Sequence, residues 1–411
     1  MRILLLSTYF RPDVAANGVI MSKLADEFVA QGHEVTVVTT VPHYDVNHIW
    51  PQYSGKLSYR EVTGGMTIYR LFTHVAEEKE SIPQRLLAYG SFHALSLARC
   101  LSLPKHDVML VPSPPLSIGI IADIVRRVRN IPFVYNVQDI WPDVAIRAGV
   151  LKDPKTIARL RRMEDYVYRR AAAIAVISEG FRQNLMAKGV PENKISVISN
   201  FNDIEHIAPR PKCNSFSQAH GLGNKFVVLF AGNMGFSQGL ETVLDAAKML
   251  EHYREVHFLM VGNGSSRASA ESYSAQLGSR NVQFLPYQPH AMVPELYGTA
   301  DVCLIPLRKG FTSESVPSKL FAIMSAARPA VASVDEGCET ATLLARAAAG
   351  RTVPPEDPGA LAKAILHYYL NPEERIREGL NGRRCAEAEF SPAAIAASYL
   401  DVLGSAVKRR P

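Results

Sequence analysis

Residues Thr312–Ala332, TSESVPSKLFAIMSAARPAVA, decide the fold of the second half of this chain. A polar loop leads into an amphipathic run, Lys319–Ala326, and a short apolar strand, Ala330–Ser333, follows it. Pro317 and Ser318 favour the first positions of a helix, where backbone N–H groups lack partners inside the helix. The stretch therefore predicts a loop, a helix and a strand in that order, as in a parallel α/β sheet.

The loop also carries charges that an ordinary capped helix does not need. The free N–H groups and the dipole at a helix N-terminus attract anions, and Lys319 adds a formal positive charge beside them. Glu314 would repel a phosphate, but its carboxylate could accept hydrogen bonds from hydroxyl groups. The segment suits a ligand that is both sugar and phosphate, and a plain capped helix stays open as the alternative.

Short apolar runs alternate with helical patterns in both halves of the chain. In the first half we expect a helix over Ile20–Gln31 and strands over Ile3–Ser7, Val35–Thr40, Val108–Val111, Phe133–Val137 and Ala173–Ile177. In the second half we expect helices over Leu240–Leu250 and Val293–Gly298, and strands over Phe226–Ala231, His257–Val261, Val282–Phe284, Val302–Pro306 and Ala330–Ser333. This alternation predicts two doubly wound α/β domains.

The polar segment Ile204–Asn224, which contains Pro209 and Pro211, is predicted to be a linker. We therefore expect a first Rossmann-like domain over residues 1–203 and a second over residues 204–390. Residues 391–411 contain an amphipathic run, Ala393–Leu403, which predicts a final helix.

The composition is that of a globular protein, with 47% hydrophobic and 20% charged residues. Five scattered cysteines without metal-ligand spacing indicate a reducing cytosol. The first residues, MRILLLSTYF, predict a buried strand and not a signal peptide, and no run reaches the roughly 20 apolar residues of a membrane span. The chain is therefore expected to be cytoplasmic.

A formal net charge of +6 points to an anionic partner. Because the chain has no recognised nucleic-acid motif, we expect no nucleic acid and prefer an acidic membrane surface. The apolar stretch Arg85–Leu103 is predicted to be either a core helix or one lying in the membrane interface. Basic residues gather in the first half: Arg126, Arg127, Arg129, Arg147, Lys152, Lys155, Arg159, Arg161, Arg162, Arg169 and Arg170.

Glu314 and the run Pro317-Ser318-Lys319-Leu320 resemble the donor-site signature of family 4 glycosyltransferases of the GT-B fold. The resemblance is to the bacterial branch that builds cell-surface polysaccharides, and it covers nearly the whole chain. It implies two Rossmann-like domains facing across a cleft, with the acceptor on the first, the nucleotide-sugar donor on the second and the final helix crossing back to the first. The second glutamate of the family is replaced by Ala322.

Glycine-rich turns follow the strands of the second half, and glycines let backbone N–H groups approach a phosphate. The first turn resembles the diphosphate loop of the family, but the arginine and lysine usual there are missing, so we expect other cations to replace them. The resemblance assigns donor binding to Gly232, Asn233, Met234, Gly235, Gln238, Arg308, Lys309, Ser315, Val316, Pro317, Ser318 and Lys319.

Two further turns are expected to line the base and ribose pocket. Gly262-Asn263-Gly264 follows the second strand of this half, and Tyr287-Gln288 follows the third. A purely structural turn remains the alternative for both.

In the first half, Asn17 and Gly18 precede a helix and are expected to contact the donor or acceptor near the cleft. Asp139 follows a buried strand within Gln138–Asp143, which resembles a motif of the polysaccharide branch. Its carboxylate could bind a hydroxyl group or act as a base.

Other polar residues of the first half are interpreted as structural. Asp143 is expected to cap a helix, Glu164 to form an ion pair and Ser178 to cap a further helix. His33 and His43 are also predicted to be structural.

The resemblance implies a retaining transferase that moves a hexose or an N-acetylaminosugar from a nucleotide-diphosphate sugar, with UDP expected, and that needs no metal or other cofactor. Glu314 and Asp139 are its expected catalytic residues. The expected acceptor is a polyprenyl-diphosphate-linked sugar at the inner membrane face, for O-antigen, capsule or exopolysaccharide. A UDP-aminosugar epimerase of the same fold and a non-catalytic nucleotide-binding scaffold are the alternatives.

Overall fold

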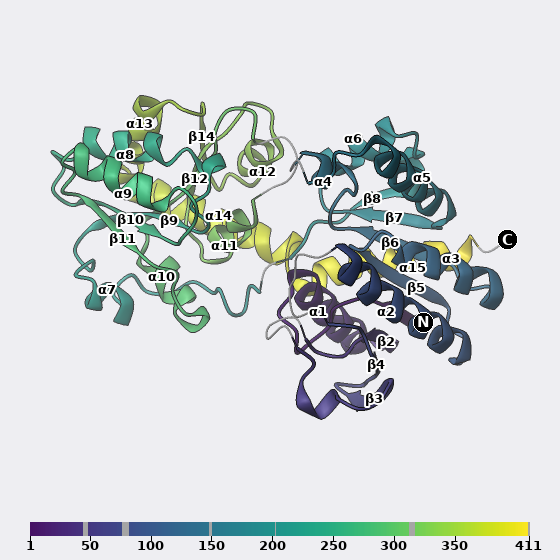
Figure 1. Ribbon diagram of the computed structural model, residues 1–411. Helices are drawn as coiled ribbons and strands as arrows, with labels where there is room; N and C mark the ends of the chain where they lie inside the picture. Colours follow the sequence, from purple (N-terminus) through teal and green to yellow (C-terminus); the bar gives the residue numbers. More distant parts are fainter. Residues whose placement is uncertain (44–47, 76–81, 148–149, 202, 312–316, 410–411) are drawn as a thin grey trace. The chain divides into compact units, whose positions relative to one another are not determined.

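The computed structural model describes residues 1–411 except 44–47, 76–81, 148–149, 202, 312–316 and 410–411 (Figure 1). It divides into two compact units. Unit 1 comprises Met1–Asn200 with Ile395–Pro411, and unit 2 comprises Phe201–Ala394.

The sheet of unit 1 has eight strands in the order β3-β4-β2-β1-β5-β6-β7-β8. All neighbours are parallel except β3 and β4. The strands are β1 Arg2–Leu6, β2 Glu34–Thr40, β3 Ser58–Thr63, β4 Met66–Leu71, β5 Val108–Ser113, β6 Phe133–Val137, β7 Ala173–Val176 and β8 Ile195–Val197.

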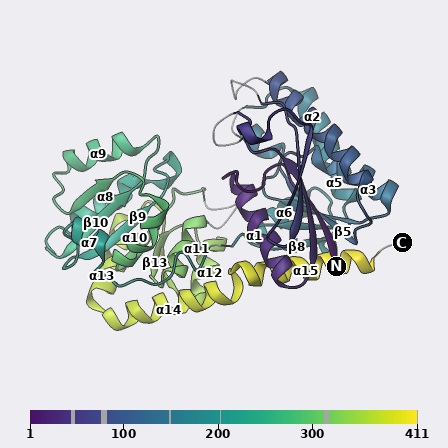
Figure 2. The ribbon, with the colours of Figure 1, turned by 90° about the horizontal axis from the view of Figure 1, so that it is seen from below.

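Helices surround this sheet, and α3 packs between α2 and α5 on one side of it (Figure 2). The helices of unit 1 are α1 Ala16–Ala30, α2 Ile82–Ser102, α3 Ile118–Arg129, α4 Asp143–Arg147, α5 Pro154–Arg170, α6 Glu179–Ala187 and most of α15 Pro392–Lys408.

The sheet of unit 2 has six parallel strands in the order β11-β10-β9-β12-β13-β14. They are β9 Phe226–Ala231, β10 Val256–Val261, β11 Val282–Leu285, β12 Val302–Pro306, β13 Ala330–Ser333 and β14 Gly350–Val353. The helices are α7 Ser215–Ala219, α8 Leu240–Met249, α9 Arg267–Gln276, α10 Val293–Thr299, α11 Ser318–Ser325, α12 Glu339–Ala347, α13 Pro358–Leu370 and α14 Pro372–Glu389.

Alternation of side chains along β9 divides the core of unit 2 between the two faces of the sheet. Phe226, Val228 and Phe230 pack with α8 and α13, whereas Val227 and Leu229 belong to the cluster that contains α11. Both faces are therefore apolar, which is why the central strands β9, β10, β12 and β13 are nearly continuous hydrophobic runs in the sequence.

The ten predicted strands are all present, each with ends within two residues of the prediction. Four strands were not predicted, namely β3, β4, β8 and β14. All but β4 are edge strands, and β3, β8 and β14 are only partly buried, so their sequences lack a long apolar run. A turn at Gly64-Gly65, with φ of 57° and 74°, joins β3 to β4.

Two predictions about helices were wrong. The segment predicted as a linker contains α7, whose first turn is capped by the Asn214 side chain accepting from the Ser217 N–H at 2.9 Å. Helix α1 begins at Ala16 and not at Ile20, so Asn17 and Gly18 lie in its first turn. Gly18 fits there because a Cβ atom would lie only 3.1 Å from the Cβ atom of Tyr9.

Within the described residues, the helical stretch Pro372–Lys408 has the length and apolar composition that a membrane span requires. Its most apolar window has a mean hydropathy of 1.3 and is 39% buried. Tyr399 in this stretch is packed inside unit 1, and packed helices of soluble proteins meet the same test, so this is weak evidence for a span.

Candidate functional site

Two glycine-rich loops meet at the carboxyl edge of the sheet in unit 2. A Cβ atom on Gly262 would lie 1.9 Å from the carbonyl oxygen of Gly232, and one on Gly264 would lie 2.6 Å from that of Met234. Both glycines also have positive φ, 148° and 156°. Only glycine allows the two backbones to approach this closely.

Backbone hydrogen bonds join these two loops into one unit. The Gly232 N–H donates to the Val261 carbonyl at 2.9 Å, and the Met234 N–H donates to the Asn263 carbonyl at 2.8 Å. The predicted donor residues Gly232–Gly235 and Gly262–Gly264 are thus brought together, with Asn233 exposed and Met234 buried.

Lys319 extends over the first of these loops from the second residue of α11. Its Nζ atom donates to Gln238 Oε1 at 2.5 Å and lies 4.2 Å from the centre of the Phe230 ring. A Cβ atom on Gly232 would lie 3.6 Å from the same Nζ atom. Burial lowers the pKa of Lys319 to about 7, because an ammonium group loses hydration there without an ion pair to any described residue.

The N-terminus of α11 lies beside this lysine. Pro317 is its N-cap and Ser318 its first residue, and among the described residues no side chain caps it. Glu314, Ser315 and Val316 lie outside the described residues. Ala322, at the position of the second family glutamate, is 8% exposed and packs in the core.

The other two expected cations differ from Lys319. The guanidinium of Arg308 lies over the Phe236 ring and donates to Glu241 Oε2 and to the Phe236 carbonyl, both at 2.8 Å. Lys309 is exposed. Arg308 would therefore have to break its ion pair with Glu241 to bind a diphosphate. Of the three cations that were expected at the diphosphate, the structure places Lys319 on the glycine loops.

The predicted base pocket contains one residue that the sequence analysis missed. Tyr287 is 58% exposed, and its hydroxyl donates to the Asn263 carbonyl at 3.4 Å, while Gln288 donates to the Pro286 carbonyl. Arg267, the first residue of α9, donates to the Gly262 carbonyl at 2.7 Å and holds the second glycine loop. The sequence signal that could have identified Arg267 is the position of a basic residue three places after Gly264.

In unit 1, Asp139 follows β6, and its side chain is exposed at the carboxyl edge of the sheet. Desolvation by the surrounding protein raises its pKa. Hydrogen bonds hold two residues that precede Asp139 in place, namely Asn136 and Gln138. Asn136 donates to the buried Tyr399 hydroxyl at 2.7 Å, and Gln138 exchanges hydrogen bonds with Asn200 at 2.9 and 3.1 Å.

Asn17 lies at the same edge and donates weakly to the Ser113 carbonyl, at 3.5 Å. Its buried Oδ1 atom accepts no hydrogen bond within the described residues. A buried acceptor without a donor is costly, so this amide suits a hydroxyl group of a ligand.

Family models match both units of the chain. Residues 18–200 match a glycosyl transferase 4-like domain, and residues 225–371 match the glycosyl transferases group 1 domain. The chain belongs to the family 4 glycosyltransferases. It is therefore an enzyme of the glycosyltransferase class.

Similar proteins agree with this assignment. WcaI of Escherichia coli (strain K12), a glycosyl transferase assigned by its name to colanic acid biosynthesis, is 27% identical over 91% of this chain and 93% of its own length. The glycosyltransferase WbjE of Pseudomonas aeruginosa is 27% identical over 64% of this chain and 66% of its own. HepE of Anabaena, solved with UDP-glucose, has a TM-score of 0.67 and 17% identity over 98% of this chain and all of its own. The fold is GT-B, as predicted.

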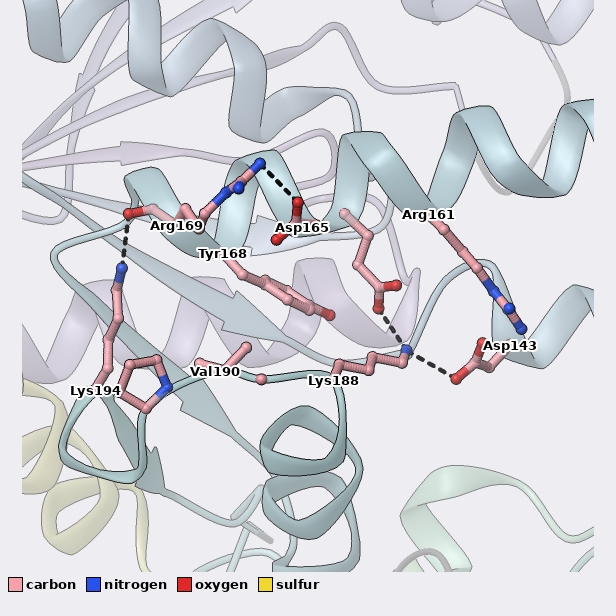
Figure 3. Close-up of a pocket in the computed structure, with 11 residues that line it drawn as sticks. Asp143, Arg161, Asp165, Tyr168, Arg169, Lys188, Val190 and Lys194 are labelled. Carbon is pink, nitrogen blue, oxygen red and sulfur yellow. Dashed lines mark hydrogen bonds and ion pairs between the residues drawn. The ribbon is translucent and has the colours of Figure 1, made fainter.

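A partly exposed lysine, Lys188, bridges two carboxylates in this glycosyltransferase and fixes the segment that follows Asp139. Lys188 Nζ lies 2.8 Å from Asp143 Oδ2 and 2.7 Å from Glu164 Oε1, which joins α4 to α5 (Figure 3). Glu164 is only 3% exposed. This contact confirms the prediction that Glu164 forms an ion pair. Asp143, which was predicted to cap a helix, is the first residue of α4 and also pairs with Lys188. Ser178 accepts from the Phe181 N–H and caps α6, as predicted.

His33 and His43 were predicted to be structural, and each makes a polar contact within unit 1. His33 Nδ1 lies 2.9 Å from the N-terminal amine, and His43 Nδ1 lies 2.8 Å from the Val41 carbonyl oxygen.

Lys188→Met should lower the free energy of unfolding by about 3 kcal/mol at pH 7, because it leaves two carboxylates without their shared cation. The loss should shrink toward pH 5, since burial already raises the pKa of Glu164 and protonation would remove its uncompensated charge. Urea unfolding followed by circular dichroism measures both values. Lys105→Met, an exposed lysine of the same unit, is the control, and equal stability of the two variants would contradict the bridge.

Proposed function

We propose that this transferase moves a hexose or an N-acetylaminosugar from a UDP-sugar to a lipid-linked or glycan acceptor, in the synthesis of a cell-surface polysaccharide. The observation that carries the proposal is the Lys319 ammonium, held on the Gly232 loop beside the N-terminus of α11. A partly desolvated cation next to backbone N–H groups suits a diphosphate. The name of WcaI and the UDP-glucose bound to HepE support the pathway and the donor.

The proposed chemistry uses this charge arrangement. Lys319 and the α11 N-terminus stabilise the negative charge that develops on the departing diphosphate, without a metal ion. Glu314 orients the hydroxyl groups of the donor sugar. The leaving phosphate takes the proton of the acceptor hydroxyl on the face that it leaves, and the anomeric configuration is retained. Asp139, whose side chain is exposed at the carboxyl edge of the sheet in unit 1, binds an acceptor hydroxyl.

Titration calorimetry with UDP, followed by incubation with UDP-sugars alone, tests this function. We expect UDP to bind and the donor sugar to stay unconverted until an acceptor is added. Conversion of the sugar without an acceptor would identify the epimerase instead, and UDP binding without any turnover on lipid extracts would identify the scaffold.

We propose that this enzyme works at the cytoplasmic membrane face. The contacts in unit 1 favour other basic residues for membrane binding than Arg126 and Arg127. Arg126 and Arg127 both pair with the buried Asp123, at 2.8 and 2.9 Å, so their charges stabilise α3.

Helix α2 packs one face into the core, at Phe92, Ser96 and Cys100. Among its described large apolar side chains, Leu87 is the most exposed. Lys152, Lys155, Arg159 and Arg162 are exposed on or just before α5, and among the described residues they form no ion pairs.

Acidic vesicles should sediment the wild-type protein at low salt, and binding should fall steeply as ionic strength rises, because each basic residue near the surface contributes about 1 kcal/mol. Arg159→Glu/Arg162→Glu should abolish it. Neutral vesicles are the control for the lipid, and Arg60→Glu, an exposed arginine on β3, is the control for the charge. Wild-type protein that stays in the supernatant over acidic vesicles would refute membrane contact and favour a soluble acceptor.

A further inference from the structure

Unit 1 contains a cavity of about 570 Å³ that the proposed transfer reaction does not use. It lies between α5 and the segment 188–194, which connects α6 to β8, and Asp143 of α4 borders one end (Figure 3). This volume is in the range of small-molecule sites.

The cavity combines an apolar floor with charged ends. Tyr168, Val190 and Pro191 line it, and the first two are 3% and 9% exposed. Figure 3 shows Arg161 and Asp143 at one end and Lys194 and Arg169 at the other. A ligand that fills it must therefore present different polar groups at its two ends.

The charges at the two ends are not equally compensated. Lys188 is neutralised by Asp143 and Glu164, and Arg169 pairs with Asp165 at 2.7 Å. The Lys194 ammonium donates only to the Arg169 carbonyl, at 2.8 Å, and forms no ion pair within the part of the chain that the structure describes. Lys194 is half-buried, and partial burial of an ammonium without a counter-ion costs some free energy, which a bound anion would offset.

The opposite end offers groups that bind hydroxyls. The Asp143 carboxylate accepts hydrogen bonds there, and Arg161, which has no ion pair to a described residue, donates them. At this end Asp143 and Glu164 balance Lys188 and Arg161, whereas Lys194 leaves the other end with a positive charge, so a phosphate is attracted more strongly to the Lys194 end.

We propose that this cavity is a second ligand site, which binds a phosphorylated sugar or polyol with its phosphate on Lys194 and its hydroxyl groups on Arg161 and Asp143. The phosphate belongs either to a soluble sugar phosphate or to a lipid headgroup, since both present the same chemistry. The site is separate from the donor loops of unit 2, so it stands or falls independently of the proposed function.

Titration calorimetry with glucose 1-phosphate, in protein saturated with UDP, tests the soluble source. Vesicles with phosphatidylinositol, compared with phosphatidylglycerol vesicles of equal charge, test the lipid source, because only the former adds a ring of hydroxyl groups. We expect binding in the first arm or preference for phosphatidylinositol in the second.

Lys194→Met should weaken that binding by about tenfold or more, as expected for a hydrogen bond to a charged group. Arg161→Gln tests the hydroxyl end without removing a hydrogen bond or ion pair to a described residue, although it removes a charge that helps to lower the pKa of Asp143. Arg60→Gln, at the opposite edge of the sheet, is the control. Affinity for UDP, measured in the same preparations, should not change in any of them. Absence of binding in both arms, or binding that neither Lys194→Met nor Arg161→Gln weakens, would overturn the proposal.

Discussion

Replacing Lys319 with alanine should weaken UDP binding by about 1–3 kcal/mol, the range for a hydrogen bond to a charged group. Lys319 lies on the Gly232 loop, and no carboxylate among the described residues neutralises it, so its charge is available to the diphosphate. Titration calorimetry measures the loss. Lys363→Ala, an exposed lysine on α13, is the control and should bind UDP like the wild type.

The same lysine predicts how UDP affinity depends on pH. Because its pKa is about 7, the Lys319 amine is largely uncharged above pH 7 when no UDP is bound. A bound diphosphate favours the ammonium and raises the pKa, so binding takes up a proton between pH 7 and pH 9. Affinity should therefore fall as the pH rises through this interval, and the slope should vanish in Lys319→Ala. UDP affinity unchanged within error in folded Lys319→Ala protein would refute the assignment.

Glu314→Gln should abolish sugar transfer while UDP affinity stays nearly that of the wild type. If the carboxylate holds the donor sugar and not the nucleotide, its loss affects the reacting part of the donor alone, and we expect at least about a 100-fold fall in kcat. Transfer kinetics and UDP titration on one preparation measure the two effects. Glu336→Gln, an exposed glutamate of the same unit, should change neither.

Equal losses of transfer and UDP affinity in Glu314→Gln would give a different answer. They would place this residue in the nucleotide site or in the fold, and the donor sugar would then need another hydrogen-bond partner.

The parts of the fold that were predictable share one property, which is burial on both faces. The strand Phe226–Ala231 is continuously apolar because helices cover both sides of its sheet, so its ends were predicted to the residue. The edge strand Ser58–Thr63 has no fully buried residue and pairs through backbone atoms, and its sequence therefore lacks the apolar signal. Helix α7 depends on a local cap at Asn214 within an otherwise polar segment.

The same reasoning applies to the candidate site. Gly232 and Gly262 were predictable because each directly follows a clearly apolar strand, and Lys319 because it lies in the first turn of a clearly patterned helix. The structure places both Gly262 and Lys319 against Gly232. The pairing of Arg308 with Glu241 was not predictable, since the two residues lie 67 positions apart. Neither was the Lys188 bridge, because long-range ion pairs depend on packing and not on spacing in the sequence.

Transfer of radiolabelled sugar from a UDP-sugar to a membrane lipid extract tests the central claim most directly. The account predicts that label moves into the organic phase in the presence of the wild-type enzyme, and that Lys319→Ala and Glu314→Gln fail to move it. Label that remains on the nucleotide across the common UDP-hexoses and UDP-N-acetylhexosamines, with every lipid and glycan acceptor added, would contradict it.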